Sequence, residues 1–102
     1  MIPEITEQRS AIDGLCRRFQ VRRLELFGSA ATGAFRVEDS DLDFLVEFEG
    51  SAWEGYADRY FGLLESLEQL FGRPVDLVSA SAIKNPYFRE SVDRSKALLF
   101  AA

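Results

Sequence analysis

The sequence of 102 residues contains no histidine. This absence excludes Ser-His-Asp chemistry, imidazole general bases and histidine-bound zinc. The single cysteine, Cys16, can form neither an internal disulfide nor a structural zinc cluster. No stretch resembles a signal peptide or a membrane span, so we expect a cytoplasmic protein with no membrane partner. Because histidine is absent and the only cysteine stands alone, any catalysis must use carboxylates, hydroxyls, lysine, arginine or a bound metal.

Positive charge is also scarce, because 12 lysines and arginines stand against 17 aspartates and glutamates, for a net charge of −5. A protein that lies along nucleic acid needs a basic footprint, so the charge balance argues against nucleic acid as a direct partner. The hydrophobic fraction of 47% is that of an ordinary globular protein. The length suits one modest core, which predicts a single domain over residues 1–102. The sequence leaves a homo-oligomer open.

The spacing of apolar residues predicts alternating helices and strands. Helices are expected over residues 3–19, weakly over 29–34, over 53–71 and over 86–94, the last with Asn85 as its N-cap. Strands are expected over residues 21–28, 40–50 and 74–79, and a final strand or extended tail over 96–101. This order favours an α/β or α+β fold in which a mixed sheet is flanked by helices.

Four acids crowd the start of the strand expected at 40–50. Because successive side chains on a strand alternate between faces, Asp41 and Asp43 project to the same side, about 6.5 Å apart at the Cα atoms. Glu38 and Asp39 are left to the preceding loop. The opposite face of the strand carries Leu42, Phe44, Val46 and Phe48. Two carboxylates this close raise each other's pKa unless a cation or several hydrogen-bond donors lie between them.

A third acid, Asp76, lies within the short apolar strand expected at 74–79. If that strand is a neighbour of the strand that carries Asp41 and Asp43, three carboxylates converge. Oxygen-only ligands suit hard cations such as Mg²⁺, which takes its remaining ligands from water and substrate phosphates. Two such ions, about 4 Å apart, are the arrangement that serves phosphoryl transfer.

The pair Gly28-Ser29 follows the first expected strand. Glycine lets the backbone turn and approach a ligand closely, and a helix that begins at Ser29 directs N–H groups and a hydroxyl toward an anion. If phosphates bind at this turn and a metal binds at the aspartates, the turn and the aspartates must open on the same cleft.

The ordered set of Gly28-Ser29, Asp41-x-Asp43 and Asp76, each in its strand context, resembles the minimal nucleotidyltransferases of the DNA polymerase β superfamily. The resemblance covers nearly the whole chain, from "LELFGS" through "SDLDFLVEF" and "GRPVDLVS" to "NPYFRESV". It implies a nucleotidyltransferase-like fold and transfer of a nucleoside monophosphate from a triphosphate to an acceptor, with release of pyrophosphate.

The resemblance also implies roles for individual residues. Asp41, Asp43 and Asp76 would be catalytic and would ligate Mg²⁺, with two ions expected, and Asp76 would help to deprotonate the acceptor hydroxyl. Gly28 and Ser29 would hold the triphosphate. Members of this size are similar to antitoxins of HEPN-MNT toxin–antitoxin pairs, which implies ATP as the donor and a tyrosine of a HEPN-type ribonuclease toxin as the acceptor.

Two departures from the family pattern keep other interpretations open. Ala30 and Thr32 stand where relatives often carry arginines, and the interval from Ser29 to Asp41 is one residue longer than expected. One alternative is a non-catalytic antitoxin that neutralises its toxin by complex formation, with a vestigial nucleotide site. Another is a small regulatory domain that senses a nucleotide without turnover.

Overall fold

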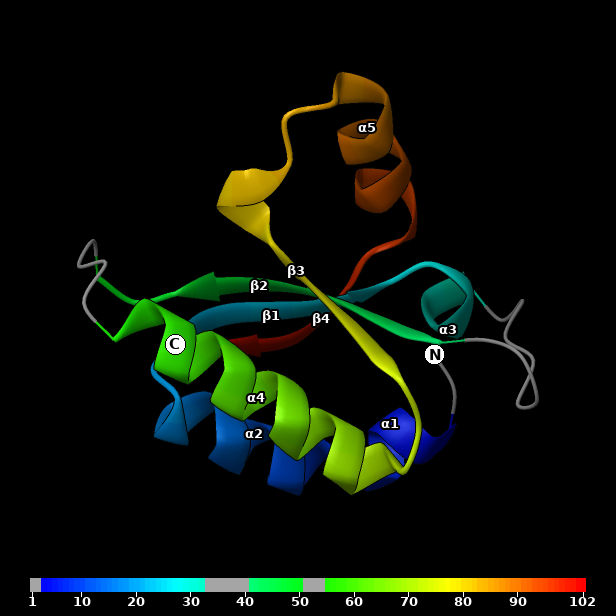
Figure 1. Ribbon diagram of the computed structural model, residues 1–102. Helices are drawn as coiled ribbons and strands as arrows, with labels where there is room; N and C mark the ends of the chain where they lie inside the picture. Colours follow the sequence, from blue (N-terminus) through cyan, green and yellow to red (C-terminus); the bar gives the residue numbers. More distant parts are fainter. Residues whose placement is uncertain (1–2, 33–40, 51–54) are drawn as a thin grey trace.

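The computed structural model describes residues 3–32, 41–50 and 55–102. The helices are α1 (Pro3–Glu7), α2 (Arg9–Arg18), α3 (Ser29–Thr32), α4 (Tyr56–Phe71) and α5 (Pro86–Ser95), with a 3-10 helix, η1, at Ala80–Ala82. The strands are β1 (Val21–Phe27), β2 (Leu42–Phe48), β3 (Val75–Ser79) and β4 (Ala97–Ala101). Figure 1 shows α2 and α4 on one side of the sheet and α5 on the other. The predicted order of elements is confirmed over the described residues.

The four strands form one mixed sheet in the order β3-β2-β1-β4. Strand β1 pairs antiparallel with both β2 and β4, whereas β2 pairs parallel with β3. The fold is therefore α+β, as the sequence predicts. The parallel pair is possible because α4 carries the chain back across one face of the sheet before β3 begins.

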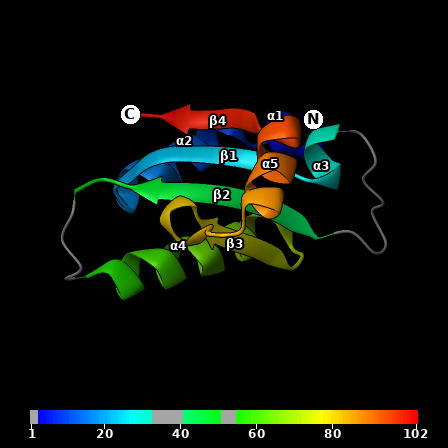
Figure 2. The ribbon, with the colours of Figure 1, turned by 90° about the horizontal axis from the view of Figure 1, so that it is seen from above.

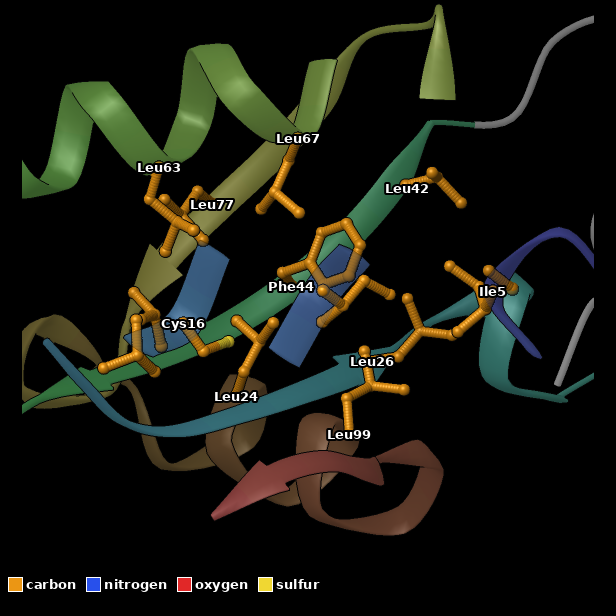
Figure 3. Packing of buried hydrophobic residues seen from close by; sticks show 14 residues of the cluster. Ile5, Cys16, Leu24, Leu26, Leu42, Phe44, Leu63, Leu67, Leu77 and Leu99 are labelled. Carbon is orange, nitrogen blue, oxygen red and sulfur yellow. The ribbon is translucent and has the colours of Figure 1, made fainter. Parts of the chain in front are cut away.

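The main core lies between the sheet and the helices α1, α2 and α4 (Figure 3). Strand β2 supplies Leu42, Phe44 and Val46 to this face, all at most 1% exposed, which confirms the predicted alternation. The ring of Phe44 stacks on Phe71 of α4, with centroids 6.2 Å apart. Burial of large aliphatic and aromatic side chains contributes roughly 2 kcal/mol for each side chain and fixes which face of β2 turns outward.

The opposite face of the sheet carries a smaller apolar cluster under α5. Its buried members are Phe27, Leu45 and Val92. Helix α5 begins as predicted, because the side chain of Asn85 accepts a hydrogen bond from the backbone N–H of Tyr87 at 2.9 Å. Figure 2 shows that α5 crosses the strands at the end of the sheet nearest α3. This is also the end at which β2 begins.

Two expectations about helix bounds need correction or lie outside the description. The helix predicted over residues 3–19 is divided at Gln8 into α1 and α2. Helical hydrogen bonds continue across the division, since the N–H of Gln8 donates to the carbonyls of Glu4 and Ile5, both at 3.2 Å. Residues 33–40 and 51–54, which include the expected first turn of the helix over 53–71, lie outside the described residues.

Within the described ranges, the structure contains no helix long and apolar enough to cross a membrane.

Candidate functional site

Asp43 occupies the centre of the acidic site. It pairs with Phe27 of β1 on one side and, in the parallel register, with Asp76 of β3 on the other. Residues paired directly in neighbouring strands project to the same face of the sheet, about 5 Å apart. The condition set by the sequence, that the two strands be neighbours, is therefore met, and Asp43 and Asp76 face the same side.

The backbone at Gly28 lies directly against the carboxylate of Asp43. Gly28 has a φ of +74°, and a Cβ atom added there would lie 2.5 Å from Oδ2 of Asp43. A side chain here would force the Asp43 carboxylate to shift, and the left-handed backbone would also be strained. The carbonyl of Gly28 accepts a hydrogen bond from the N–H of Ala31 at 3.1 Å, which closes the first turn of α3. The turn and the acids thus share one site.

The pKa of Asp43 is raised to about 6. Burial is the largest cause, followed by the negative charges of Asp76 and then Asp41. The carboxylate of Asp41 is thus close enough to act on Asp43, although Asp41 itself is exposed and precedes β2. The charges of Asp76 and Asp41 both act on Asp43, and in the absence of a cation this repulsion favours the protonated form of Asp43.

The remaining predicted site residues are placed only in part. Ser29 is the first residue of α3, directly after Gly28, as the sequence predicts. Its hydroxyl lies outside the described part of the chain, as do the side chain of Thr32 and the loop acids Glu38 and Asp39.

Comparison with known proteins decides the family. Residues 9–99 match the family model described as a nucleotidyltransferase domain. A candidate protein adenylyltransferase of Methanocaldococcus jannaschii is 36% identical over 92 residues, which are 90% of this chain and 88% of that protein. This chain is a member of the nucleotidyltransferase domain family. It is accordingly an enzyme of the nucleotidyltransferase type.

Solved structures share the fold. One toxin–antitoxin structure with AMP-PNP has a TM-score of 0.71 at 21% identity, over 92% of this chain and 73% of that chain. A Shewanella oneidensis structure contains a tri-AMPylated HEPN toxin in complex with an MNT antitoxin. It has a TM-score of 0.66 at 18% identity, over 96% of this chain and 73% of that chain. These likenesses establish the nucleotidyltransferase-like arrangement of helices and sheet.

The acidic site of this nucleotidyltransferase suits Mg²⁺ by the chemistry of its ligands. Among the described residues, no three acidic, histidine or cysteine side chains form a ready-made metal cluster. Mg²⁺ does not need one, since it keeps several waters and is commonly held by one or two carboxylates together with substrate phosphates. Asp43 and Asp76, paired across β2 and β3, offer such carboxylates beside a backbone turn.

The structure qualifies the expectation about the missing arginines. Ala30 is 0% exposed and belongs to the main core cluster. The side chain at this position faces the interior, so an arginine here would not reach solvent without displacing its neighbours. Ala30 is therefore a packing residue of this nucleotidyltransferase, and its lack of charge is matched to its environment.

Sequence reasoning missed two residues near the site. Tyr60 of α4 donates a hydrogen bond to the carbonyl of Leu77, and its pKa is raised by burial first and by the charge of Asp76 second. Ser95, the last residue of α5, accepts a hydrogen bond from the backbone N–H of Gly28 at 3.1 Å. Sequence reasoning missed Tyr60 because its place in the apolar spacing of the helix indicates a packing role. For Ser95 no local pattern could have signalled a contact with a residue 67 positions away.

Proposed function

We propose that this nucleotidyltransferase transfers AMP from ATP to a hydroxyl group of a partner protein. The observation that carries the proposal is the contact between the Gly28 backbone and the Asp43 carboxylate. Because of this contact, one substrate molecule can meet both a turn that can receive phosphates and a carboxylate that can hold a cation. Both features stand in the order that the resemblance to minimal nucleotidyltransferases implies.

Each site residue has a role in this proposal. Asp41, Asp43 and Asp76 would hold Mg²⁺, with two ions expected, and Gly28 and Ser29 would receive the triphosphate. Bound Mg²⁺ would neutralise charge that develops on the phosphate oxygens. The raised pKa of Asp43 supports this assignment, because a cation would relieve the repulsion that burial and neighbouring carboxylates impose.

The reaction proceeds by attack of the acceptor oxygen on the α-phosphorus of ATP. A bond forms between that oxygen and the α-phosphorus, and the bond from the α-phosphorus to the bridging oxygen breaks, which releases pyrophosphate. Asp76 accepts the proton of the acceptor hydroxyl and passes it to solvent. Asp76 suits this step because it is exposed and adjacent to Asp43.

The proposed acceptor is a tyrosine of a HEPN-type toxin, which makes the chain an antitoxin that acts in the cytoplasm. Support comes from a similar protein named as a candidate protein adenylyltransferase. Further support comes from a similar fold found in a complex with an AMP-modified HEPN toxin. The acidic net charge of −5 agrees with a protein partner rather than nucleic acid.

The test uses ATP labelled at the α-phosphate, Mg²⁺ and a HEPN-type toxin as the acceptor protein. We expect label on the partner from α-labelled ATP and none from γ-labelled ATP, since AMP rather than phosphate is transferred. Chelation by EDTA should abolish labelling, and mass spectrometry should locate AMP on tyrosine.

The variant Asp43→Asn should lose transfer, and Glu47→Gln is its matched control. Glu47 lies on the same strand and the same face of the sheet, but it is exposed and pairs with Arg22 at 3.7 Å. Transfer that survives Asp41→Asn combined with Asp43→Asn would sink the proposal.

A second candidate is an antitoxin that acts by complex formation alone. The observation that favours it is Thr32, an uncharged residue at a position where the family pattern often has an arginine. It predicts that the double aspartate variant still binds and inhibits the toxin. A toxin released from inhibition by that variant would exclude it.

A further inference from the structure

Helix α5 packs against β1 through several contacts near the candidate site. Val92 is 1% exposed and packs in a cluster with Phe27. The rings of Phe27 and Phe88 meet edge to face, with centroids 6.1 Å apart. Just beyond the helix, Nζ of Lys96 lies 3.7 Å from Oε2 of the buried Glu25. The last turn of α5 is therefore held over the end of β1, where the turn at position 28 follows.

Ser95 completes this attachment with a hydrogen bond to the turn itself. The backbone N–H of Gly28 donates to Oγ of Ser95 at 3.1 Å. The hydroxyl proton of Ser95 is directed back into its own helix, since the carbonyls of Ser91 and Val92 both lie 3.4 Å from Oγ. With its proton committed to the helix, the oxygen presents a lone pair to Gly28.

This hydrogen bond orients the peptide plane that enters the turn. Gly28 has a φ of +74°, lies against Asp43 and, through its carbonyl, accepts from Ala31 at 3.1 Å. A glycine backbone has wide conformational freedom, so one fixed N–H on one side and one fixed carbonyl on the other restrict it strongly. The N–H of Gly28 already donates to Ser95. Gly28 therefore contributes to ligand binding through the conformation of its backbone.

We propose that Ser95 is a positioning residue for nucleotide binding, which acts by holding the Gly28 turn against the Asp43 carboxylate. This inference rests on the proposed function, since the turn is taken as the triphosphate site. Ser95 acts through its hydrogen bond to Gly28 and has no part in the chemical step. Its effect is to keep the turn in the conformation that receives phosphates before ATP arrives, so its loss weakens binding more than chemistry.

The variants Ser95→Ala, Ser95→Thr and Ser91→Ala test the inference. Ser95→Ala removes the acceptor oxygen, whereas Ser95→Thr retains it. Ser91→Ala is the matched control, because Ser91 is an exposed serine one turn earlier on the same helix and only its carbonyl faces Ser95. Thermal unfolding of all three variants shows whether each is folded at the assay temperature.

Equilibrium titration with ATP and Mg²⁺ gives the first readout. We expect Ser95→Ala to bind ATP roughly three- to tenfold more weakly, the effect of one lost hydrogen bond. Ser95→Thr and Ser91→Ala should bind as the unmodified protein does. In the transfer assay, the KM for ATP should rise with kcat nearly unchanged, because a binding conformation is lost while the chemical step is not.

Amide hydrogen exchange by NMR gives a readout that does not depend on activity. The Gly28 amide should exchange faster in Ser95→Ala, while amides in the centre of β1 keep their protection. Unchanged ATP affinity in Ser95→Ala, or a Ser95→Thr variant as weak as Ser95→Ala, would overturn the inference. If the protein binds ATP but transfers no AMP, the proposed activity fails, and the affinity of Ser95→Ala still decides the role of Ser95.

Discussion

Asp43 and Asp76 are direct partners across the parallel strands β2 and β3. Burial, together with the charges of Asp76 and then Asp41, raises the pKa of Asp43 to about 6 from an ordinary value of 3.8. Because the folded state holds this proton more tightly than the unfolded state, Asp43 favours folding below pH 3.8 and that contribution is lost as pH rises to about 6. Above pH 6 the ionised Asp43 carboxylate lowers the free energy of unfolding of the metal-free protein by a constant amount.

We therefore predict that Asp43→Asn stabilises the metal-free protein above pH 6. The expected gain is about 1 kcal/mol, smaller than the pKa change alone implies, because Asp43 is partly exposed and solvent screens its charge. Urea unfolding in EDTA at several pH values measures it. The difference between variant and unmodified protein should grow from pH 4 to 6 and then stay level. A difference independent of pH would contradict the assignment.

Gly28→Ala should strongly reduce the candidate activity. The new Cβ would lie 2.5 Å from Oδ2 of Asp43, so the turn and the carboxylate must separate. We expect AMP transfer to fall roughly 100-fold, as for misplaced catalytic groups. Gly72→Ala is the control, since Gly72 has a φ of +63° but no described heavy atom within 4 Å of the added Cβ. It should lose about 1–2 kcal/mol of stability and retain activity.

Ala30→Arg should destabilise the protein instead of activating it. Ala30 is fully buried in the main core, so the new side chain must displace its neighbours or leave a charge unpaired in the interior. The expected loss in the free energy of unfolding is on the order of 3 kcal/mol or more. Ala57→Arg, at an exposed position of α4, should change stability little. A stable Ala30→Arg variant with higher ATP affinity would refute this interpretation.

Cys16 should be inert in the folded protein. Burial, aided by the nearby charge of Asp13, raises the pKa of its thiol to about 12, and its side chain is 0% exposed. The thiolate that reacts with disulfide reagents is therefore almost absent near neutral pH. Ellman's reagent should react at once in concentrated urea and, without urea, only as fast as the protein unfolds. Rapid stoichiometric reaction of the native protein would contradict the buried position.

The sequence predicts the strands and the acids because both depend on local spacing. Alternation at Leu42, Asp43 and Phe44 assigns one face of β2 to the core and the other to the site, and the structure has the same assignment. The cap at Asn85 is likewise a local signal. The resemblance adds the order of the motifs, from which the family follows. The roles of Asp41, Asp43 and Asp76 stay predictions until the variants are measured.

Features set by distant contacts could not be read from the sequence. Glu25 alternates with Leu24 and Leu26 like a solvent-facing strand residue, yet it is 5% exposed and pairs with Lys96 from the other end of the chain. Ser95 shows no pattern at all, because its partner Gly28 is brought to it by the sheet order. The burial of Ala30 also depends on how the turn docks on the core.

The sheet order has a consequence for synthesis and folding. Strand β1 lies inside the sheet and receives β4, whose residues Ala97 and Leu98 pair with Leu26 and Glu25. Contacts over so many residues form slowly, since a long segment of chain must close first. A growing chain therefore cannot finish the centre of its sheet, or brace the turn at Gly28, until α5 and β4 have left the ribosome. Assembly of the site waits for a segment made long after the turn itself.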